Sequence, residues 1–358
     1  MENRVRSVIT GTGSFIPDSI VTNEDFLDNK FLEKDGKPFD KSNQEIIEKF
    51  REITGIKERR YADDNMLASD MGAIAAEKAL ESSGLDPEKL DYIIVAHNFG
   101  DVLAHNRRVD MVPALASRVK HKLGVQNPKC IAYDLPFGCP GWVQGVIQSD
   151  YFIRSGDAKS TLVVGTETLS RICDPHDRDS MIYSDGAGAT VLQAGKPGDS
   201  KGILSHAART DTASEAYYLA MKKSYNPDHG DDLYMKMDGR KLYQYAITHV
   251  PGLVKESIDK SGLKLENIRK VLIHQANEKM DEAILKRLFK LYDKDEIPED
   301  IMPMTISELG NSSVATVPTL LDLVLRNKLE NHQLNTGDEI VLASVGAGMN
   351  INSVVYRM

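Results

Sequence analysis

The sequence is poor in cysteine, and this excludes several classes of protein. Only Cys130, Cys139 and Cys173 occur among 358 residues, too few for a disulfide framework and with no zinc-binding spacing. No apolar run is long enough to span a membrane, and the first residues, MENRVRSVITGTG, lack the apolar core of a signal peptide. We therefore expect a cytoplasmic protein in a reducing compartment, with no membrane insertion.

Positive charge is also scarce. The chain carries 44 Lys and Arg against 53 Asp and Glu, a formal net charge of -9, which argues against general nucleic-acid binding. One basic cluster stands out against this background: Lys279, Lys286, Arg287 and Lys290. Helical spacing places 279, 286 and 290 on one face, with 287 beside them. A solvated helix face is the usual explanation, and docking of an acidic partner is the alternative.

Two further motifs do not support a bound cofactor. The stretch GTGSFIP resembles a dinucleotide fingerprint but lacks the third glycine and has Pro17 where a helix would begin. The acidic run DPHDRDSMIYSD lacks the glycine and the final glutamate of a calcium loop. We expect neither a nucleotide cofactor nor a metal.

Short β-branched runs alternate with helical patterns, which is typical of an α/β protein with mainly parallel, buried sheets. Helices are predicted at 69–84, 140–155, 239–261, 278–292 and 313–329. Strands are predicted at 5–10, 91–97, 129–134, 161–167, 188–194, 202–208, 270–275, 339–344 and 349–358. A Gly- and Pro-containing stretch at 194–202 divides the chain into units of 1–198 and 199–358 with similar plans. This similarity suggests a duplicated fold.

Cys139 lies in the sequence PFGCPGW, between a predicted strand and a predicted helix. Gly138 permits an unusual backbone angle, and Pro140 suits the first position of a helix. Cys139 would then be the N-cap, where the helix dipole lowers the pKa of a thiol and favours a nucleophilic thiolate. A buried structural cysteine is the alternative here, and core packing is the expected role of Cys130 and Cys173.

Polar residues at two later positions are candidates for the same chemistry. His274 follows the apolar strand KVLI, at the strand end where α/β folds carry their active sites. Asn311, after Gly310, is either a catalytic amide or a helix cap. In the loop SVGAGMN, Gly346 and Gly348 would let backbone N–H groups point at an oxyanion, although a plain hairpin turn fits equally well.

These motifs together resemble the thiolase-type condensing enzymes, and most of all β-ketoacyl-[acyl carrier protein] synthase III. The similar stretches run along nearly the whole chain: GTGSFIP, ITGIKERR, CDPHDRDSMIYSDGAGATVL, IHQAN, GNSSVATVP and the final GAGMN with SVVYRM. The resemblance implies a five-layered α-β-α-β-α fold made of two duplicated halves, and a homodimer. It implies decarboxylative condensation of an acyl thioester with malonyl-[acyl carrier protein].

The resemblance also implies roles for individual residues. Cys139 would accept the acyl group, and His274 and Asn311 would complete a Cys-His-Asn triad and donate hydrogen bonds to an enolate. The oxyanion hole would use the backbone N–H groups of Cys139 and Ala347. Further implied contacts are Arg178 near the coenzyme A nucleotide, Asn277 at the pantetheine, and Lys279, Lys286, Arg287 and Lys290 as the docking face for acyl carrier protein. No separate cofactor is expected, because the thioester substrates carry the pantetheine themselves.

The chain departs from the family pattern at several positions. Phe137 and Trp142 are bulky and are expected to shape the acyl pocket. Lys49 and Ile53 stand where the family has a tryptophan and an arginine that hold adenine, and segment 98–112 is longer than usual. These departures imply that the acyl primer differs from the short acyl-coenzyme A that is usual in the family. Acyl transfer to a hydroxyl or amine, non-decarboxylative joining of two acyl chains, and hydrolysis by a cysteine hydrolase are the competing functions.

Overall fold

The N-terminal half of the molecule is built on a five-stranded sheet with the order β1-β9-β8-β4-β7. The structure is a computed structural model that describes residues 5–196 and 198–358. The strands are β1 (Ser7–Phe15), β9 (Asp185–Ala194), β8 (Ser160–Thr168), β4 (Tyr92–His97) and β7 (Ile131–Pro136). β4 is parallel to both β7 and β8, whereas β9 is antiparallel to both β1 and β8.

The C-terminal half contains a four-stranded sheet with the order β10-β15-β14-β13. Its strands are β10 (Gly202–Thr210), β15 (Asn350–Arg357), β14 (Glu339–Gly346) and β13 (Ile268–Ile273). β13 and β14 are parallel, and β15 is antiparallel to both of its neighbours.

Both sheets repeat one arrangement, in which the first strand of each half lies antiparallel beside the last. The expectation of mainly parallel sheets is therefore wrong: the sheets are mixed, because the last strand of each half returns in the opposite direction before the chain leaves it. The predicted division at 198 and 199 falls between β9 and β10 and stays a prediction.

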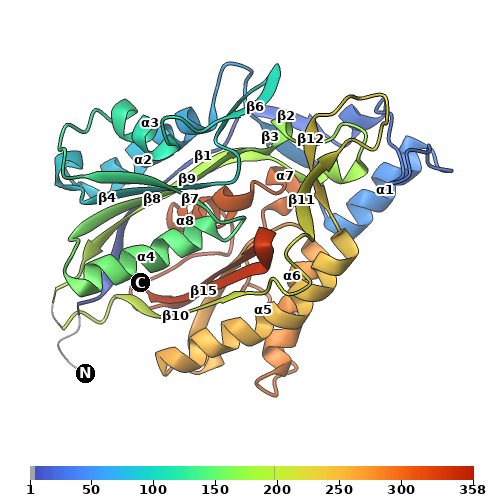
Figure 1. The fold of residues 1–358 in the computed structure, drawn as a ribbon. Coiled ribbons are helices and arrows are strands. Elements are labelled where there is room, and N and C mark those ends of the chain that lie inside the picture. Colours follow the sequence, from blue (N-terminus) through green and yellow to red (C-terminus); the bar gives the residue numbers. More distant parts are fainter. Residues whose placement is uncertain (1–4, 197) are drawn as a thin grey trace.

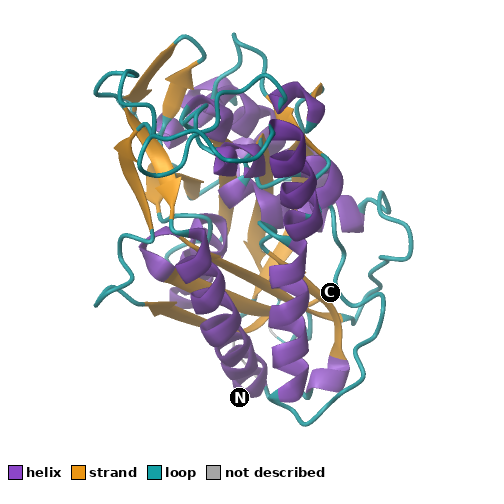
Figure 2. Ribbon diagram, turned by 90° about the vertical axis from the view of Figure 1, so that its right-hand side faces the viewer, coloured by secondary structure: helices purple, strands orange, loops and turns teal. Residues whose placement is uncertain are grey.

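Helices form three layers around the two sheets (Figures 1 and 2). α4 (Gly141–Ser155) and α8 (Thr316–Leu325) lie between the sheets, and each contacts strands of both. α2 (Ala68–Ser83) and α3 (Leu115–Lys122) cover the outer face of the N-terminal sheet. α5 (Gly239–Ser261) packs on the C-terminal sheet, and α6 (Glu278–Lys290) packs beside α5 in the same hydrophobic core. The sequence of α8, TVPTLLDLVL, is apolar on nearly all sides, which is why it occupies the central layer.

The remaining elements lie outside the two sheets and their helical layers. They are α1 (Asn43–Thr54), α7 (Ile306–Leu309) and three antiparallel strand pairs: β2 (Ser19–Thr22) with β3 (Glu58–Tyr61), β5 (Asp101–Leu103) with β6 (Asn106–Asp110), and β11 (Leu219–Lys223) with β12 (Leu233–Met237). The long segment 98–112 is thus partly a hairpin. The β11–β12 pair lies on the same side of the molecule as α1 (Figure 1).

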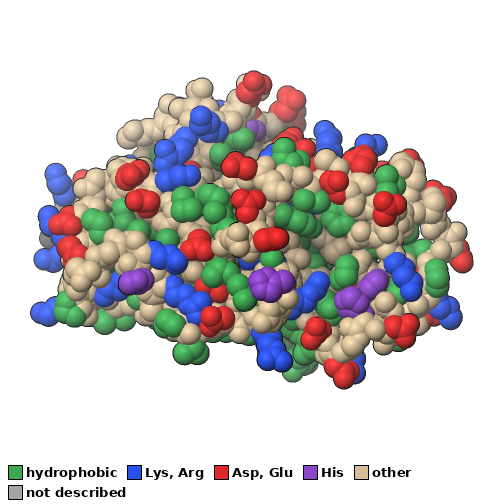
Figure 3. All heavy atoms as spheres, turned by 90° about the horizontal axis from the view of Figure 1, so that it is seen from above, with side chains coloured by type: hydrophobic (Ala, Val, Ile, Leu, Met, Phe, Trp, Pro, Cys, Tyr) green, Lys and Arg blue, Asp and Glu red, His purple; other side chains and the backbone are tan. Residues whose placement is uncertain are grey.

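The surface mixes charge of both signs. On the face seen in Figure 3, acidic and basic side chains are interspersed, with apolar ones between them. Within residues 5–196 and 198–358, no helix is long and apolar enough to cross a membrane.

Candidate active site

Cys139, His274 and Asn311 line one cavity of about 230 Å³, although they are far apart in the sequence. Each follows a different element: β7, β13 and α7. The rest of the lining is mostly apolar, and hairpin β11–β12 contributes Leu219, Ala220, Met221, Met235 and Met237 to it. An apolar chamber with a few convergent polar groups is the usual form of a small-molecule site.

The backbone turns sharply at the cysteine. Gly138 has φ 67°, in the left-handed region that glycine tolerates, as the sequence predicted. The N-cap of α4 is Pro140, with φ -72° and ψ 0°, and not Cys139. The predicted N-cap position of Cys139 is therefore wrong by one residue, because the first hydrogen bond of the helix runs from the Gln144 N–H to the carbonyl of Pro140 at 2.9 Å.

The GAG loop lies directly against this turn. A Cβ atom built on Gly138 would be 2.8 Å from both the backbone nitrogen and the backbone oxygen of Ala347. A Cβ atom on Gly346 would be 2.5 Å from the backbone nitrogen of Cys139. Both positions have room only for glycine, so the backbones of residues 138–139 and 346–347 approach each other closely. This brings together the two segments whose N–H groups the sequence suggested for an oxyanion hole.

The Cys139 thiol is neutral in the resting site. Burial raises the pKa of Cys139 to about 11, against a hydrogen bond from the Ser313 hydroxyl that lowers it. The sequence predicted that the helix dipole would lower the pKa of this thiol, but burial has the larger effect. Moving a thiolate out of water costs more free energy than the partial positive charge at the start of a helix provides. Chemistry at this sulfur therefore requires groups that stabilise the thiolate as it forms.

His274 continues the ladder of β13, since its backbone N–H donates to the carbonyl of Ala343 across 2.9 Å. Burial lowers the pKa of His274 to about 4, although a hydrogen bond with the backbone of Ser313 works in the opposite direction. The imidazole is thus neutral at physiological pH. A neutral imidazole has one N–H donor and one acceptor nitrogen.

Asn311 is held by its own backbone and by its side-chain oxygen. The backbone N–H donates to the carbonyl of Ile182, and the carbonyl accepts from Ser184. The Asn311 Oδ1 atom accepts a hydrogen bond from the Ser313 N–H at 2.8 Å. Because the oxygen is occupied, the amide NH₂ is the group left to donate into the cavity. The α8 N-cap is Ala315, so Asn311 does not cap that helix.

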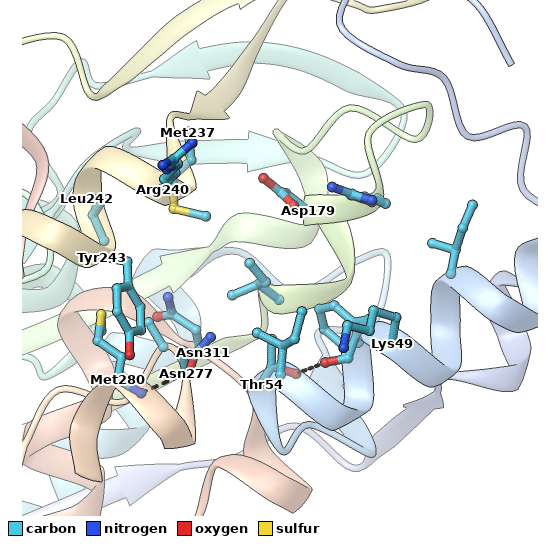
Figure 4. A pocket seen from close by; sticks show the side chains of 17 residues that line it. Lys49, Thr54, Asp179, Met237, Arg240, Leu242, Tyr243, Asn277, Met280 and Asn311 are labelled. Carbon is cyan, nitrogen blue, oxygen red and sulfur yellow. Dashed lines mark hydrogen bonds between the residues drawn. The ribbon is translucent and has the colours of Figure 1, made fainter. Parts of the chain in front are cut away.

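A second cavity of about 400 Å³ adjoins the first and shares Met237, Leu242, Ala276, Met280 and Asn311 with it. Figure 4 shows Lys49 and Thr54 of α1 on one side of it and Tyr243 and Met280 on the other. Its lining is largely apolar, with Lys49, Arg178, Asp179 and Arg240 as its charged members. The two cavities together form a passage from α1 to Cys139.

The residues expected to contact a carrier line this passage. Arg178 places its guanidinium 4.9 Å from the centre of the Phe39 ring. Asn277 caps α6, since its Oδ1 accepts from the Met280 N–H at 3.0 Å, which leaves its NH₂ to donate. Lys49 and Ile53 also line the passage, so the two departures from the family pattern lie at its wall.

Two expected pocket residues lie elsewhere. Trp142 is fully buried, and it packs with Ile94, Val163 and Leu342 in the core between the sheets. Neither Trp142 nor Phe137 is among the described residues that line the two cavities. The structure does not support the prediction that they shape the acyl pocket: Trp142 lies on α4, which carries it into the core.

The basic cluster is exposed along α6. Lys279, Lys286, Arg287 and Lys290 all face solvent, and the last three line a shallow groove between α5 and α6. Lys279 lies 3.9 Å from Glu52, and Lys290 lies 3.8 Å from Asp295, so both ion pairs are loose. Arg287 donates to the carbonyl of Ile247 at 3.0 Å, so the three lysines are the members best able to meet another surface.

Three polar residues near the thiol were not predicted as site residues: Asn98, Glu167 and Ser313. Ser313 Oγ donates to Cys139 Sγ at 3.3 Å. Its place in GNSS, two residues after Asn311, was the one signal that pointed to it. Glu167 was hidden inside the buried strand STLVVGTET.

The two mixed sheets with a central helical layer, and a cysteine, a histidine and an asparagine converging from three segments on an apolar chamber, define a condensing enzyme of the thiolase type. Such enzymes are acyltransferases. Among the described residues, no cluster of three or more His, Cys, Asp or Glu could hold a metal ion.

Comparison with known proteins identifies the family within this class. Residues 133–212 match the family model for 3-oxoacyl-[acyl-carrier-protein (ACP)] synthase III, and residues 258–358 match the model for its C-terminal part. The chain is 34% identical over 354 residues to β-ketoacyl-[acyl-carrier-protein] synthase III 1 of Vibrio vulnificus, covering 98% of this chain and 99% of that one. It is also 34% identical over 355 residues to the synthase III of Clostridium acetobutylicum, with 98% of each chain covered.

Solved structures agree with this assignment. The crystal structure of 3-oxoacyl-[acyl-carrier-protein] synthase III from Aquifex aeolicus matches with a TM-score of 0.80 at 29% identity, covering 98% of this chain and 100% of that one. The enzyme from Pseudomonas aeruginosa matches with the same TM-score at 28% identity, and 98% of each chain is covered. The chain belongs to the β-ketoacyl-[acyl carrier protein] synthase III family, and it has the thiolase-like fold.

Proposed function

We propose that this protein joins an acyl thioester to malonyl-[acyl carrier protein] by decarboxylative Claisen condensation, through an acyl group held on Cys139. The observation that carries the proposal is the convergence of Cys139, His274 and Asn311 on one apolar cavity. Its relatives in Vibrio and Clostridium are named for the same class of reaction.

In the first half-reaction, the Cys139 sulfur attacks the thioester carbonyl of the primer. A bond forms from Sγ to the acyl carbon, the carbon–sulfur bond to the carrier breaks, and the carrier thiol leaves with a proton. Negative charge on the carbonyl oxygen accepts hydrogen bonds from the backbone N–H groups of Cys139 and Ala347. The close approach of residues 138–139 and 346–347 supports this pairing.

In the second half-reaction, the malonyl thioester loses carbon dioxide. The resulting enolate oxygen accepts hydrogen bonds from the His274 ring and the Asn311 amide, and the enolate carbon attacks the acyl carbonyl on Cys139. The Cys139 thiolate then leaves and is protonated again. The neutral state of His274 and the occupied oxygen of Asn311 support their roles as donors.

The substrates would reach Cys139 through the passage beside α1. Arg178 and Asn277 line this passage, which supports their proposed contacts with the substrate's carrier arm. The exposure of the basic cluster on α6 supports docking of an acidic carrier protein. Lys49 and Ile53 have no aromatic ring to stack on the adenine of coenzyme A. The acylation assay should therefore use primers attached to coenzyme A and primers attached to a carrier protein. No cofactor beyond the pantetheine of the substrates enters the proposal.

We also propose a homodimer formed at strand β7. This strand pairs with β4 on one edge, and within the described residues no strand pairs with its other edge. Its side chains are mostly half-buried or exposed, and three apolar side chains are left in solvent: Ile131 on β7, Val109 on β6 and Val112 just after β6. An unpaired edge with exposed apolar side chains is suited to pairing with a second copy. Size-exclusion chromatography with light scattering tests this.

The three unpaired cysteines suit a reducing compartment, which supports a cytoplasmic enzyme.

The experiment that tests the function is acylation followed by intact-mass analysis. Wild-type protein incubated with an acyl thioester should gain the mass of one acyl group at Cys139, and malonyl-[acyl carrier protein] should then remove it. Carbon dioxide should appear in proportion to the condensed product. A label at another residue, or product formed without carbon dioxide from malonyl substrate, would contradict the proposal; hydrolysis of the acyl group alone would indicate a hydrolase.

A further inference from the structure

A short chain of buried and half-buried polar groups runs from the nucleophile into the N-terminal sheet. Ser313 Oγ donates to Cys139 Sγ at 3.3 Å and accepts from Asn98 Nδ2 at 3.2 Å. Asn98 Nδ2 also donates to Glu167 Oε1 at 2.9 Å, and the Asn98 backbone N–H donates to the same oxygen. The chain thus joins four residues from four different segments, and it ends on a carboxyl group.

The direction of these hydrogen bonds is fixed by chemistry. An amide NH₂ only donates, so the Ser313 oxygen is the acceptor of its bond with Asn98. The Ser313 hydroxyl in turn donates its own proton to the sulfur in this structure. Glu167 holds Asn98 at two points, and in this way it holds the amide against the serine.

The backbone at Ser313 supports a selected geometry. Ser313 has φ 53°, which is unfavourable for a residue with a Cβ atom, and it is 3% exposed. Its N–H is bound to Asn311 Oδ1 at the same time. A strained residue of this kind at a reactive centre is a feature that the surrounding structure must maintain.

Glu167 is a buried carboxyl group on strand β8 with little compensating charge. Burial raises the pKa of Glu167 to about 7, with His97 acting in the opposite direction. The titratable groups around Glu167 are His97, Asp185 and Cys139; Tyr183 also faces Cys139. His97 is itself 2.9 Å from Asp134 on the neighbouring strand. A negative charge on Glu167 opposes formation of a thiolate at Cys139.

We propose that Ser313 is a further catalytic residue, which donates a hydrogen bond to the Cys139 thiolate, and that Asn98 and Glu167 are positioning residues that aim it. Glu167 acts on the sulfur in two opposed ways. Its oxygen orients the chain of donors and so favours the thiolate, while its charge disfavours it. The inference rests on the proposed role of Cys139 as nucleophile.

The test separates the two effects with two variants. Ser313→Ala removes the donor, so the apparent pKa of Cys139 should rise, and alkylation of this thiol by iodoacetamide at pH 8 should slow about tenfold, as one pKa unit implies. Glu167→Gln keeps an oxygen for Asn98 and removes the charge, so the apparent pKa should fall and alkylation at pH 8 should quicken several-fold. The rates are measured from pH 6 to 10 on the free enzyme, where the logarithm of the rate rises linearly with pH below the pKa, and the displacement of this line along the pH axis gives the change in pKa; the modified cysteine is mapped by mass spectrometry.

Two further variants protect the test from effects on folding. Ser313→Gly also removes the hydroxyl but suits φ 53°, so it should shift the pKa of Cys139 in the same direction as Ser313→Ala. Ser312→Ala removes the adjacent hydroxyl, which bonds to Thr316 and not to the thiol, so it should leave the pKa of Cys139 unchanged.

The direction in which each variant shifts the pKa of Cys139 decides the outcome. An unchanged pKa of Cys139 in either Ser313 variant or in Glu167→Gln overturns the inference, as does a shift of the same sign in Ser313→Ala and Glu167→Gln. Alkylation needs no acyl or malonyl substrate. A failure here with normal acylation of Cys139 would therefore remove this inference and leave the proposed function standing, whereas absence of acylation would remove the proposed function.

Discussion

Gly346 lies against Cys139 with no room for a side chain between them: a Cβ atom at position 346 would be 2.5 Å from the Cys139 backbone nitrogen and 2.8 Å from its Cβ atom. Gly346→Ala must therefore displace either the nucleophile or the GAG loop. Because one oxyanion donor contributes about 10²–10³ in rate, we expect acylation of Cys139 to slow by about this factor.

Gly252→Ala is the matched control for that substitution. A Cβ atom at Gly252, which is exposed within α5, would meet no atom within 4 Å. Alanine in a helix interior is favoured over glycine by roughly 0.5–1 kcal/mol, so this variant should unfold at slightly higher urea concentration and acylate normally. Acylation of Gly346→Ala at the wild-type rate would contradict the close packing of the two loops.

His274 and Asn311 should separate the two half-reactions. His274→Ala and Asn311→Ala remove enolate donors and leave the Cys139 oxyanion hole in place, so each should slow malonyl decarboxylation at least about 10²-fold while acylation continues. Since the pKa of His274 is lowered to about 4, the imidazole stays neutral through the neutral range. The rate of decarboxylation should consequently show no inflection near pH 6.5. Equal loss of both half-reactions would indicate that these residues act on Cys139 instead.

Lys236 lies on β12, in the β11–β12 hairpin that lines the Cys139 cavity, and its ion pairs hold this hairpin in place. Its ammonium lies 2.5 Å from Asp174 and 3.0 Å from Asp177, and its side chain is only 2% exposed. Burial works to raise the pKa of Asp174, but hydrogen bonds, that of Lys236 first among them, hold it below its usual value. Lys236→Met leaves both carboxylates buried without their cation and should cost about 3–5 kcal/mol in the free energy of unfolding at pH 7.

The pH dependence of the Lys236 effect follows from the lowered pKa of Asp174. The stability that this carboxylate contributes is present above the pKa of an unfolded aspartate, about 4, and is lost as the pH falls further. The difference between wild type and Lys236→Met in urea unfolding should therefore shrink below pH 4. Lys223→Met, which breaks an exposed ion pair with Asp231, should change stability by less than about 1 kcal/mol. Equal effects of the two variants would contradict the anchoring role.

Sequence periodicity predicted the frame of the molecule but not the contacts that make its site. Helix α5 was predicted with its observed bounds, and α6 was predicted from its first residue, because their apolar faces repeat at helical spacing over several turns. The hairpins of segments 98–112 and 219–237 were missed, since their strands are short and partly exposed and carry little alternation.

Individual side chains show the limit more sharply. Trp142 follows the nucleophile closely in sequence, yet α4 turns it into the core between the sheets, so proximity along the chain was a poor guide to the pocket. Glu167 lies in a strand whose residues are all buried, and no single-sequence pattern indicates which of them faces Asn98. Such contacts join residues that are far apart in the chain, and they become visible only once the sheets are assembled.

Asp281 is a buried carboxyl group without a partner: within the described chain, neither of its oxygens accepts a hydrogen bond. Burial raises its pKa well above the usual value, with Glu278 and Glu282 adding to the effect. A group whose folded pKa is raised stabilises the fold below its unfolded pKa, and this contribution is lost as the pH rises. Asp281→Leu should therefore be more stable than wild type by about 1–3 kcal/mol at pH 8, with a smaller gain at pH 4.

Asp281→Asn checks the cause of that gain. It removes the titrating group and keeps the shape of the side chain, so its stability relative to wild type should also improve from pH 4 to pH 8. At both pH values it should be less stable than Asp281→Leu, because the buried amide remains unpaired. Urea unfolding at both pH values measures this. A pH-independent difference for both variants would show that Asp281 does not titrate differently in the folded and unfolded states.

The basic cluster of α6 should act on carrier-bound substrates alone. Lys286→Glu with Lys290→Glu reverses two exposed charges at the groove between α5 and α6, away from the residues that line the passage to Cys139. Reversal of charge at a docking surface weakens encounter with an acidic partner and makes it less sensitive to salt. The KM for malonyl-[acyl carrier protein] should rise about tenfold at low ionic strength, while acylation by a small thioester such as an acyl-N-acetylcysteamine is unchanged. The control for net charge is Lys201→Glu with Lys328→Glu, which reverses two exposed lysines before β10 and beyond α8. Equal rises in KM for the two double variants would mean that the protein's overall charge, and not this face, governs binding of the carrier.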